Sequence, residues 1–212
     1  MRKVVAGIVG FALCSGSVLH AAAWTPPSGS NGTINYTNGQ DINGLFGNPG
    51  IGEQKFAFAN PSSFEVVSPA GPLNITDTAS VNVAASPGLF LNTVSVRVEG
   101  NYTIVGSPAT LTFSGSLNID GGAIVAPIVF VPSSPITSGS ALFIGTALID
   151  LPASTSSVQA SLTFTMSAMS SGSATAQMQN LNADLTFTTI PEPTTLGLLA
   201  GAGSMLLRRR RA

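Results

Sequence analysis

The sequence is short of the side chains on which most catalytic and metal sites depend. Its 212 residues include one cysteine, Cys14, and one histidine, His20, and both precede residue 24. Disulfides therefore cannot stabilise the segment 24–190. The same segment lacks the commonest general base and metal ligand. Burial of apolar side chains has to hold it together.

Charged residues are scarce as well, at 8% of the chain. Between residues 24 and 190 the basic side chains are Lys55 and Arg97 alone. Neutralising nucleic-acid phosphates requires a surface of Lys and Arg, so this composition excludes nucleic acid as a partner. The acidic residues outnumber the basic ones by eight to two, for a net charge of about −6 in this segment: Asp41, Glu53, Glu65, Asp77, Glu99, Asp120, Asp150 and Asp184.

Ser, Thr, Asn and Gly take the place of charge, and they are combined with Val, Ile and Phe. These residue types favour strands and turns over helices. Apolar runs that end at turn signals recur every ~8 to 12 residues, with no long amphipathic helix between them. The pattern predicts an all-β body over residues 51–190, an antiparallel β-sandwich of about 9–10 strands.

The clearest strand is the run from Val94 to Val98, in which valines alternate with polar residues. Gly100 and Asn101 follow it, and then Tyr102 and Ile104. One face is apolar and the other polar, and Gly-Asn is typical of a turn. We therefore predict a hairpin that packs one side on the core.

Three other stretches carry specific predictions. Ile124–Val131 is interrupted by Pro127, which favours an edge strand or a bent strand. Ala141–Leu151 is uniformly apolar and predicts either a fully buried central strand or a short helix. The apolar parity of the last strand changes after Met178, which predicts a bulge near Asn180.

Residues 24–50 are rich in Gly, Asn, Pro and Ser and show little apolar periodicity. We expect a mobile arm or a loosely paired first strand there. Beyond its phenylalanines, the segment 24–190 has the aromatic residues Trp24, Tyr36 and Tyr102. Exposed aromatic rings can stack on the apolar faces of sugar rings, so these three are the candidate ligand contacts.

The N-terminus has the three regions of a secretory signal peptide. Arg2 and Lys3 precede an apolar run from Val4 to Leu19. Ala21 and Ala23 then provide an A-x-A cleavage site just before Trp24. We predict that residues 1–23 direct the chain through the secretory translocon and are removed.

The C-terminal segment, residues 191–212, has three parts. Pro191-Glu192-Pro193 is followed by an apolar run, Thr194–Leu207, and then by Arg208, Arg209, Arg210 and Arg211. As a helix the apolar run would be about 21 Å long, short of the ~30 Å apolar core of a bilayer. Arginine stems can lie along the apolar layer and close this gap. The positive cluster keeps the C-terminus in the cytoplasm, so we predict a short transmembrane helix with the body outside.

This order of parts resembles the PEP-CTERM sorting signal of Gram-negative bacteria, over about a tenth of the chain. Pro191, Glu192 and Pro193 match the motif that gives the family its name. The resemblance implies recognition by exosortase, a protease-like membrane enzyme thought to cut near the motif and release or re-anchor the protein. It also implies a transient stay in the inner membrane, a final location at the cell surface or outside it, and an association with exopolysaccharide.

Three hypotheses for the body follow. The first is a non-enzymatic structural or interaction protein of the cell surface or extracellular matrix, with no catalytic residue, metal or cofactor. The second is a carbohydrate-binding module that recognises the exopolysaccharide. The third is a secreted hydrolase, which requires two carboxylates in one pocket. We favour the first hypothesis.

A bound calcium ion would need oxygen ligands such as Asp41 with Asn43, or Asn118 with Asp120.

Overall fold

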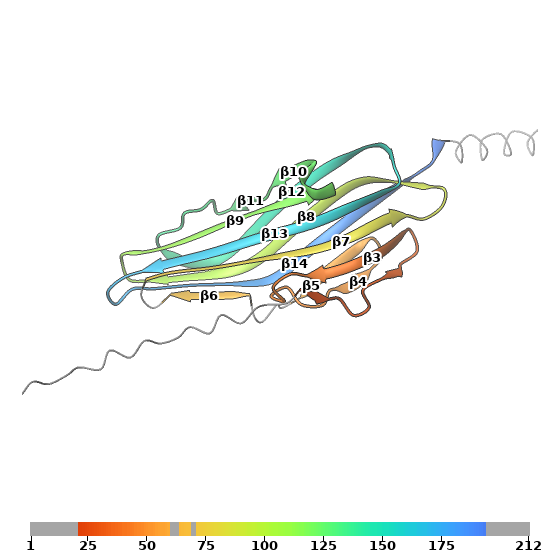
Figure 1. Ribbon diagram of the computed structural model, residues 1–212. Coiled ribbons are helices and arrows are strands. Elements are labelled where there is room, and N and C mark those ends of the chain that lie inside the picture. The colour runs from red at the N-terminus through yellow and green to blue at the C-terminus, as the bar shows by residue number, and fades with distance from the viewer. Residues whose placement is uncertain (1–20, 60–63, 69–70, 194–212) are drawn as a thin grey trace, which may run out of the picture.

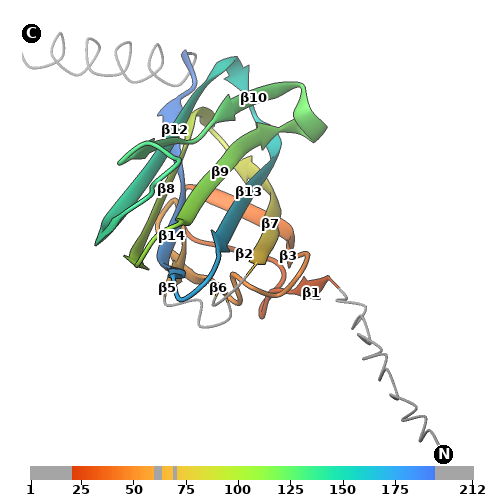
Figure 2. The same cartoon turned by 90° about the vertical axis from the view of Figure 1, so that its left-hand side faces the viewer.

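The computed structural model describes residues 21–59, 64–68 and 71–193. Two seven-stranded antiparallel sheets pack face to face, as the view along the strands in Figure 2 shows. This confirms the predicted all-β antiparallel sandwich, although the fourteen strands exceed the 9–10 expected. The predicted signal helix and transmembrane helix fall on residues outside those described. Within the described ranges, no helix has the length and apolar character to cross a bilayer.

The first sheet, called sheet A, has its neighbouring strands in the order β1, β3, β7, β13, β9, β10, with β2 paired to β3 (Figure 1). A 3₁₀ turn, η1 (Asp120–Gly122), connects β9 to β10. The strands of sheet A are β1 (Ala22–Ala23), β2 (Gly29–Ser30), β3 (Ile34–Asp41), β7 (Gly71–Ala85), β9 (Ala109–Ile119), β10 (Ile124–Pro127) and β13 (Ser157–Ser170).

The second sheet, sheet B, has the order β11, β12, β8, β14, β5, β4, with β6 paired to β14. Its strands are β4 (Gly50–Gly52), β5 (Lys55–Ala59), β6 (Glu65–Ser68), β8 (Leu89–Val105), β11 (Val129–Val131), β12 (Gly139–Thr155) and β14 (Thr175–Pro191).

Strict alternation builds the core between the sheets. In β13 every second side chain from Val158 to Ala168 is buried, and the residues between them face solvent. Aromatic rings fill the middle: Phe113 and Phe143 stack with centroids 4.9 Å apart, and Phe130 stacks on Phe164 at 5.7 Å. Each fully buried large apolar side chain contributes about 1.5–3 kcal/mol. This burial replaces the disulfides that the described part cannot form.

The hairpin predicted at Gly100 is wrong, because β8 runs unbroken from Leu89 to Val105. Gly100 lies in mid-strand, paired with Phe143 on one side and Asn180 on the other. A Cβ at Gly100 would overlap the Phe143 ring. This glycine therefore makes room for a core side chain instead of forming a turn.

The prediction for Ile124–Val131 is confirmed. The stretch forms two edge strands, and the chain leaves sheet A after Pro127 and enters sheet B at Val129. The bulge predicted near Asn180 is also confirmed, since the pairing of β14 with β8 shifts register between Asn180 and Asn182. Proline and the extra residue act as expected, because both interrupt a regular ladder.

For Ala141–Leu151 both expected alternatives are wrong. The segment belongs to β12, which lies next to the edge of sheet B. Phe143 is buried, whereas Leu142 and Leu148 are 66% and 59% exposed on the outer face. The segment therefore carries apolar residues on both faces of the strand, of which one packs in the core and the other is exposed to solvent.

Of the two alternatives predicted for the segment 24–50, the mobile arm is wrong, and the paired strand is present but is an integral part of sheet A. Its strand β3 pairs with β7 inside sheet A. Trp24, Ile34 and Phe46 are buried in the common core. Gly39 allows this packing, because a Cβ there would overlap the Trp24 ring. The segment therefore belongs to the sandwich despite its polar composition.

Candidate functional site

The proline-flanked motif continues the last strand of the sandwich. Pro191 is the final residue of β14 and is opposite Leu89. The Glu192 N–H then donates to the Gly88 carbonyl at 3.0 Å. The two prolines are exposed, and Glu192 is half-buried. The motif thus lies against the β7–β8 turn at one end of the molecule (Figure 1). Arg208 to Arg211 lie outside the described residues.

The predicted cleavage site lies on the other sheet, at the edge of sheet A. Ala21 and Ala23 are exposed, and Ala22–Ala23 form the short strand β1 against β3. Trp24 follows directly, and its backbone N–H donates to the Gly39 carbonyl at 2.9 Å. Cleavage after Ala23 would therefore leave an N-terminal residue that is anchored in the core.

The three aromatic candidates for ligand contact are all buried. Trp24, Tyr36 and Tyr102 are 2%, 3% and 8% exposed. The Trp24 and Tyr36 rings both pack on Phe56, with centroids 5.2 and 5.3 Å away. The prediction that they form exposed stacking platforms is wrong, because all three side chains point into the core.

Asp41 and Asp77 lie together at the edge of the core, under the loop 42–47. Asp77 accepts the N–H groups of Asn43 at 2.9 Å, Leu45 at 2.7 Å and Phe46 at 3.1 Å. Asp41 accepts the Gly47 N–H at 2.6 Å. Burial, and then the neighbouring Asp77, raise the pKa of Asp41 to about 7. Backbone donors surround the pair, so it fixes the loop.

The other acids are dispersed. Asp184 pairs with Lys55 at 2.7 Å, and Glu99 with Arg97. None of the grooves found among the described residues is lined by two carboxylates. The same residues hold no cluster of three or more His, Cys, Asp or Glu side chains suited to a metal.

The two predicted calcium-ligand pairs are engaged in hydrogen bonds of the fold. The Asn43 side-chain amide donates to the Thr76 carbonyl at 2.7 Å. Asn118 donates to the Ser116 hydroxyl at 3.0 Å, and Asp120 accepts the Gln159 N–H at 2.8 Å. Neither pair presents a set of converging free oxygens.

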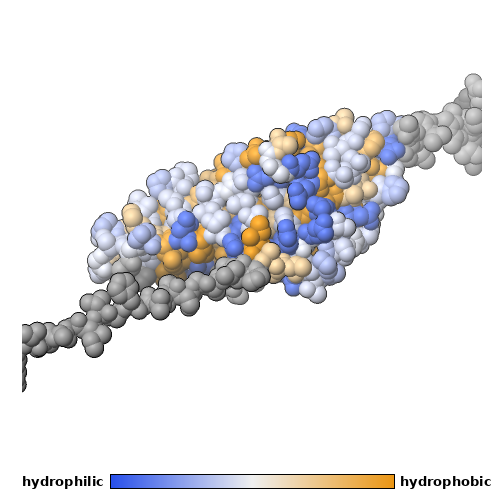
Figure 3. Space-filling model, in the orientation of Figure 1, coloured by the Kyte–Doolittle hydropathy of each residue, from blue (hydrophilic) through white to orange (hydrophobic). Residues whose placement is uncertain are grey.

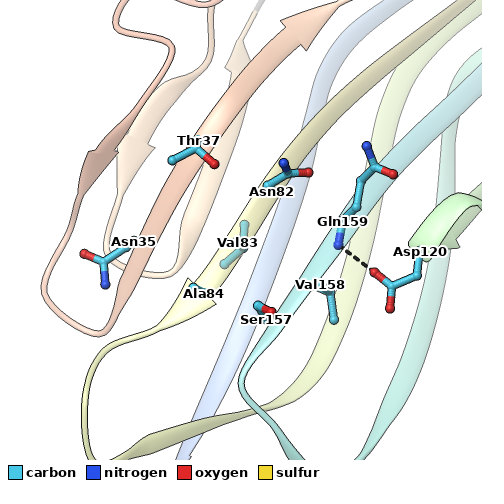
Figure 4. Close-up of a pocket in the computed structure, with 9 residues that line it drawn as sticks. All are labelled: Asn35, Thr37, Asn82, Val83, Ala84, Asp120, Ser157, Val158 and Gln159. Atoms are coloured by element: carbon cyan, nitrogen blue, oxygen red, sulfur yellow. Dashed lines mark hydrogen bonds between the residues drawn. The ribbon is translucent and has the colours of Figure 1, made fainter.

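An open groove of about 640 Å³ crosses the outer face of sheet A (Figure 4). A second groove of about 390 Å³ adjoins it, because both are lined by Asn82 and Gln159. We call the two together the polar trench. Its polar side chains come from β3, β7, β13 and η1: Asn35, Thr37, Asn38, Gln40, Asn82, Asp120, Ser157 and Gln159.

Local backbone irregularities shape the polar trench. The pairing of β3 with β7 shifts register between Thr37 and Gln40, and Asn38 has a φ of 54°. This bulge turns both Thr37 and Asn38 outward, while Gly39 faces Trp24. Asp120, with a φ of 50°, borders the other end. Non-glycine residues at positive φ are uncommon and occur preferentially at functional sites.

Sequence reasoning missed this site. A signal was present, since the inward parity of β3 changes between Tyr36 and Asp41, as it does near Asn180. The polar composition of residues 24–50 concealed it, because so few apolar residues mark the inward face.

The sequence matches no protein-family model and no curated protein. Solved structures that align with it include a bacteriophage CBA120 tailspike protein 4 enzymatically active domain, at 14% identity and a TM-score of 0.23, over 60% of this chain and 20% of that one. Infectious bursal disease virus structures align at 14% identity. The Gt strain has a TM-score of 0.24 over 70% of this chain and 46% of that one, and the Gx strain 0.23 over 63% and 41%. The alignments thus span less than half of those chains, and the scores are too low to carry an argument.

Proposed function

We propose that this protein is an exported structural or interaction protein of the cell surface or extracellular matrix, sorted by an exosortase-like enzyme. The order of parts at the C-terminus carries the proposal: Pro191-Glu192-Pro193, a short apolar run, and four arginines. The A-x-A site at Ala21 and Ala23 supports entry into the secretory route.

The position of the motif supports this function. It begins at the last residue of β14 and ends two residues beyond it, so cleavage beyond Pro193 removes no residue of the described core. Its two prolines are exposed, and one backbone hydrogen bond joins Glu192 to the turn at Gly88. A membrane enzyme can therefore reach the segment while the sandwich stays folded.

The test is the intact mass of the protein recovered from membrane and medium fractions, with and without the host's exosortase. We expect loss of the residues beyond about Pro193 only when the enzyme is present. Glu192→Ala should abolish this cleavage. Glu53→Ala, which alters an exposed glutamate in the turn between β4 and β5, serves as the matched control.

Two results would contradict the proposal. One is a C-terminus that still ends at Ala212 in both strains. The other is a Glu192→Ala protein that is cut and released as fast as the wild type. The hydrolase alternative gains no support from the geometry, since none of the four main grooves in the described part is lined by two acids.

A further inference from the structure

The polar trench presents hydrogen-bonding groups that the fold itself does not use. The side chains of Asn35, Asn82 and Gln159 make no hydrogen bond to other described residues, and neither does the Thr37 hydroxyl. Each amide offers two donors and an acceptor with two lone pairs, and each hydroxyl both donates and accepts. The trench thus has donors and acceptors in similar numbers.

The lack of basic side chains in the polar trench excludes several ligand classes. No Lys or Arg lines either groove, so phosphate and sulfate groups have no counter-charge there. The single carboxylate, Asp120, already accepts the Gln159 N–H. An isolated carboxylate with one such bond is a poor cation site. A ligand that matches these groups is uncharged and carries many hydroxyls.

The surroundings of the trench are uncharged too. Every outward-facing residue of β7, β9 and β13 is neutral. Hydroxyl pairs continue the polar surface along these strands: Thr76 with Thr165 at 2.8 Å, and Thr78 with Thr163 at 2.9 Å. Figure 3, which views this face, shows pale, weakly polar residues and groups of blue hydrophilic ones, with patches of orange hydrophobic residues between them. A long polymer could extend from the trench without meeting a charge.

We propose that the polar trench binds a neutral polysaccharide. The Asn82 and Gln159 amides, which are cross-strand partners at its centre, donate to and accept from neighbouring sugar hydroxyls. Asp120 accepts from a further hydroxyl through its remaining lone pairs. From β3 to η1 the trench spans three strand spacings, about 14 Å, which suits an oligosaccharide more than a single sugar. The inference rests on the proposed function only in that export brings the chain to such polymers.

The test is calorimetric titration of the purified full-length protein in mild detergent. The probes are linear hexasaccharides of glucose, mannose and galactose, with hexagalacturonate as the acidic counterpart. Sheet B offers a matched control, because Asn101 and Gln179 are also cross-strand partners with outward-facing side chains. The test variant is N82A/Q159A and the control variant is N101A/Q179A.

We expect at least one neutral hexasaccharide to bind. N82A/Q159A should weaken it about tenfold or more, since two hydrogen-bonding amides are lost. N101A/Q179A should leave binding unchanged, and thermal melts of both variants should match the wild type. The proposal is overturned if no neutral hexasaccharide binds at millimolar concentration, if hexagalacturonate binds as well as the neutral probes, or if both double variants bind like the wild type.

The two proposals fail separately. The titration does not depend on C-terminal processing, so Glu192→Ala protein should bind the hexasaccharide normally. Conversely, N82A/Q159A protein should be cut beyond Pro193 at the wild-type rate. An unprocessed protein that binds the neutral hexasaccharide would therefore refute the sorting assignment alone.

Discussion

The outer faces of the two sheets differ sharply, although both belong to one sandwich and share one core. Sheet A presents hydroxyls and amides on β7, β9 and β13 with no charge. Sheet B carries both ion pairs of the described residues, Lys55 with Asp184 and Arg97 with Glu99. Large apolar side chains are exposed on both sheets, for example Met169 at 56% on sheet A and Leu142 at 66% on sheet B, so the difference is one of charge.

Strand alternation alone cannot account for this difference, because both sheets alternate equally well. Solubility does not require it either, since charged residues would serve on either face. The outer face of sheet A also contains the bulge at Asn38 and the polar trench, in which Asp120 is the single charged residue. The difference supports the proposal that the polar trench of sheet A binds a neutral ligand, while sheet B has an ordinary mixed surface.

The largest effect is expected in the core that both faces share. Phe164 is fully buried, with ring centroids 5.3 Å from Phe64 and 5.7 Å from Phe130. Phe164→Ala should lower the free energy of unfolding by about 3–5 kcal/mol, because it removes contacts and leaves a cavity. Urea unfolding measures this. A loss below about 1 kcal/mol would mean that the two sheets do not pack as described.

A pH-dependent effect is expected at the edge of sheet A. With a folded pKa of about 7, Asp41 keeps its proton where the unfolded chain, with a pKa of 3.8, has released it. The contribution of the protonated Asp41 to the free energy of unfolding is complete below pH 3.8, declines as the pH rises and is lost above about pH 7. Asp41→Asn should remove this decline, of the order of 4 kcal/mol, leaving the variant more stable than the wild type at pH 8.

The control for that experiment is on sheet B. Asp184→Asn alters a carboxylate that is paired with Lys55. Unlike Asp41, Asp184 has no second buried acid beside it among the described residues. Chemical unfolding at pH 4, 6 and 8 compares both variants with the wild type. If Asp41→Asn and the wild type have parallel profiles, the two carboxyls do not share the buried environment described.

The smallest effect should come from the ion pairs of sheet B. The Lys55 side chain is 42% exposed, so solvent screens its attraction to Asp184. Lys55→Gln should change the free energy of unfolding by less than about 1 kcal/mol, and less still at high salt. Thermal melts at low and high salt measure this. A larger loss of stability would mean that the Lys55–Asp184 pair stabilises sheet B more than is expected of an exposed ion pair.

Some structural features followed from local chemistry and were correctly predicted. The bulge near Asn180 follows from a change in apolar parity, and the edge position at Pro127 follows from a missing N–H donor. Other features depended on partners distant in sequence. Gly100 looks like a turn residue until Phe143 is known to lie over it. Trp24 looks exposed until Gly39 provides space for its ring.

The candidate sites divide in the same way. The motif at Pro191 to Pro193 could be read directly, because its signal is residue type and order. The polar trench could not, since it gathers Asn35 and Thr37 from β3, Asn82 from β7 and Gln159 from β13. Those residues are over a hundred positions apart at the extremes, and strand pairing alone brings them together.

By itself, the sequence determined the fold class, the scarcity of charge, and the predicted export and sorting signals. These depend on composition, periodicity and the order of neighbouring residues. Only the tertiary structure decided which face of each strand is buried, that Trp24, Tyr36 and Tyr102 are core residues, and that the outward-facing residues of β7, β9 and β13 are all neutral. The physical reason is that burial and strand register are properties of pairs of segments, and no single segment contains the information about its partner.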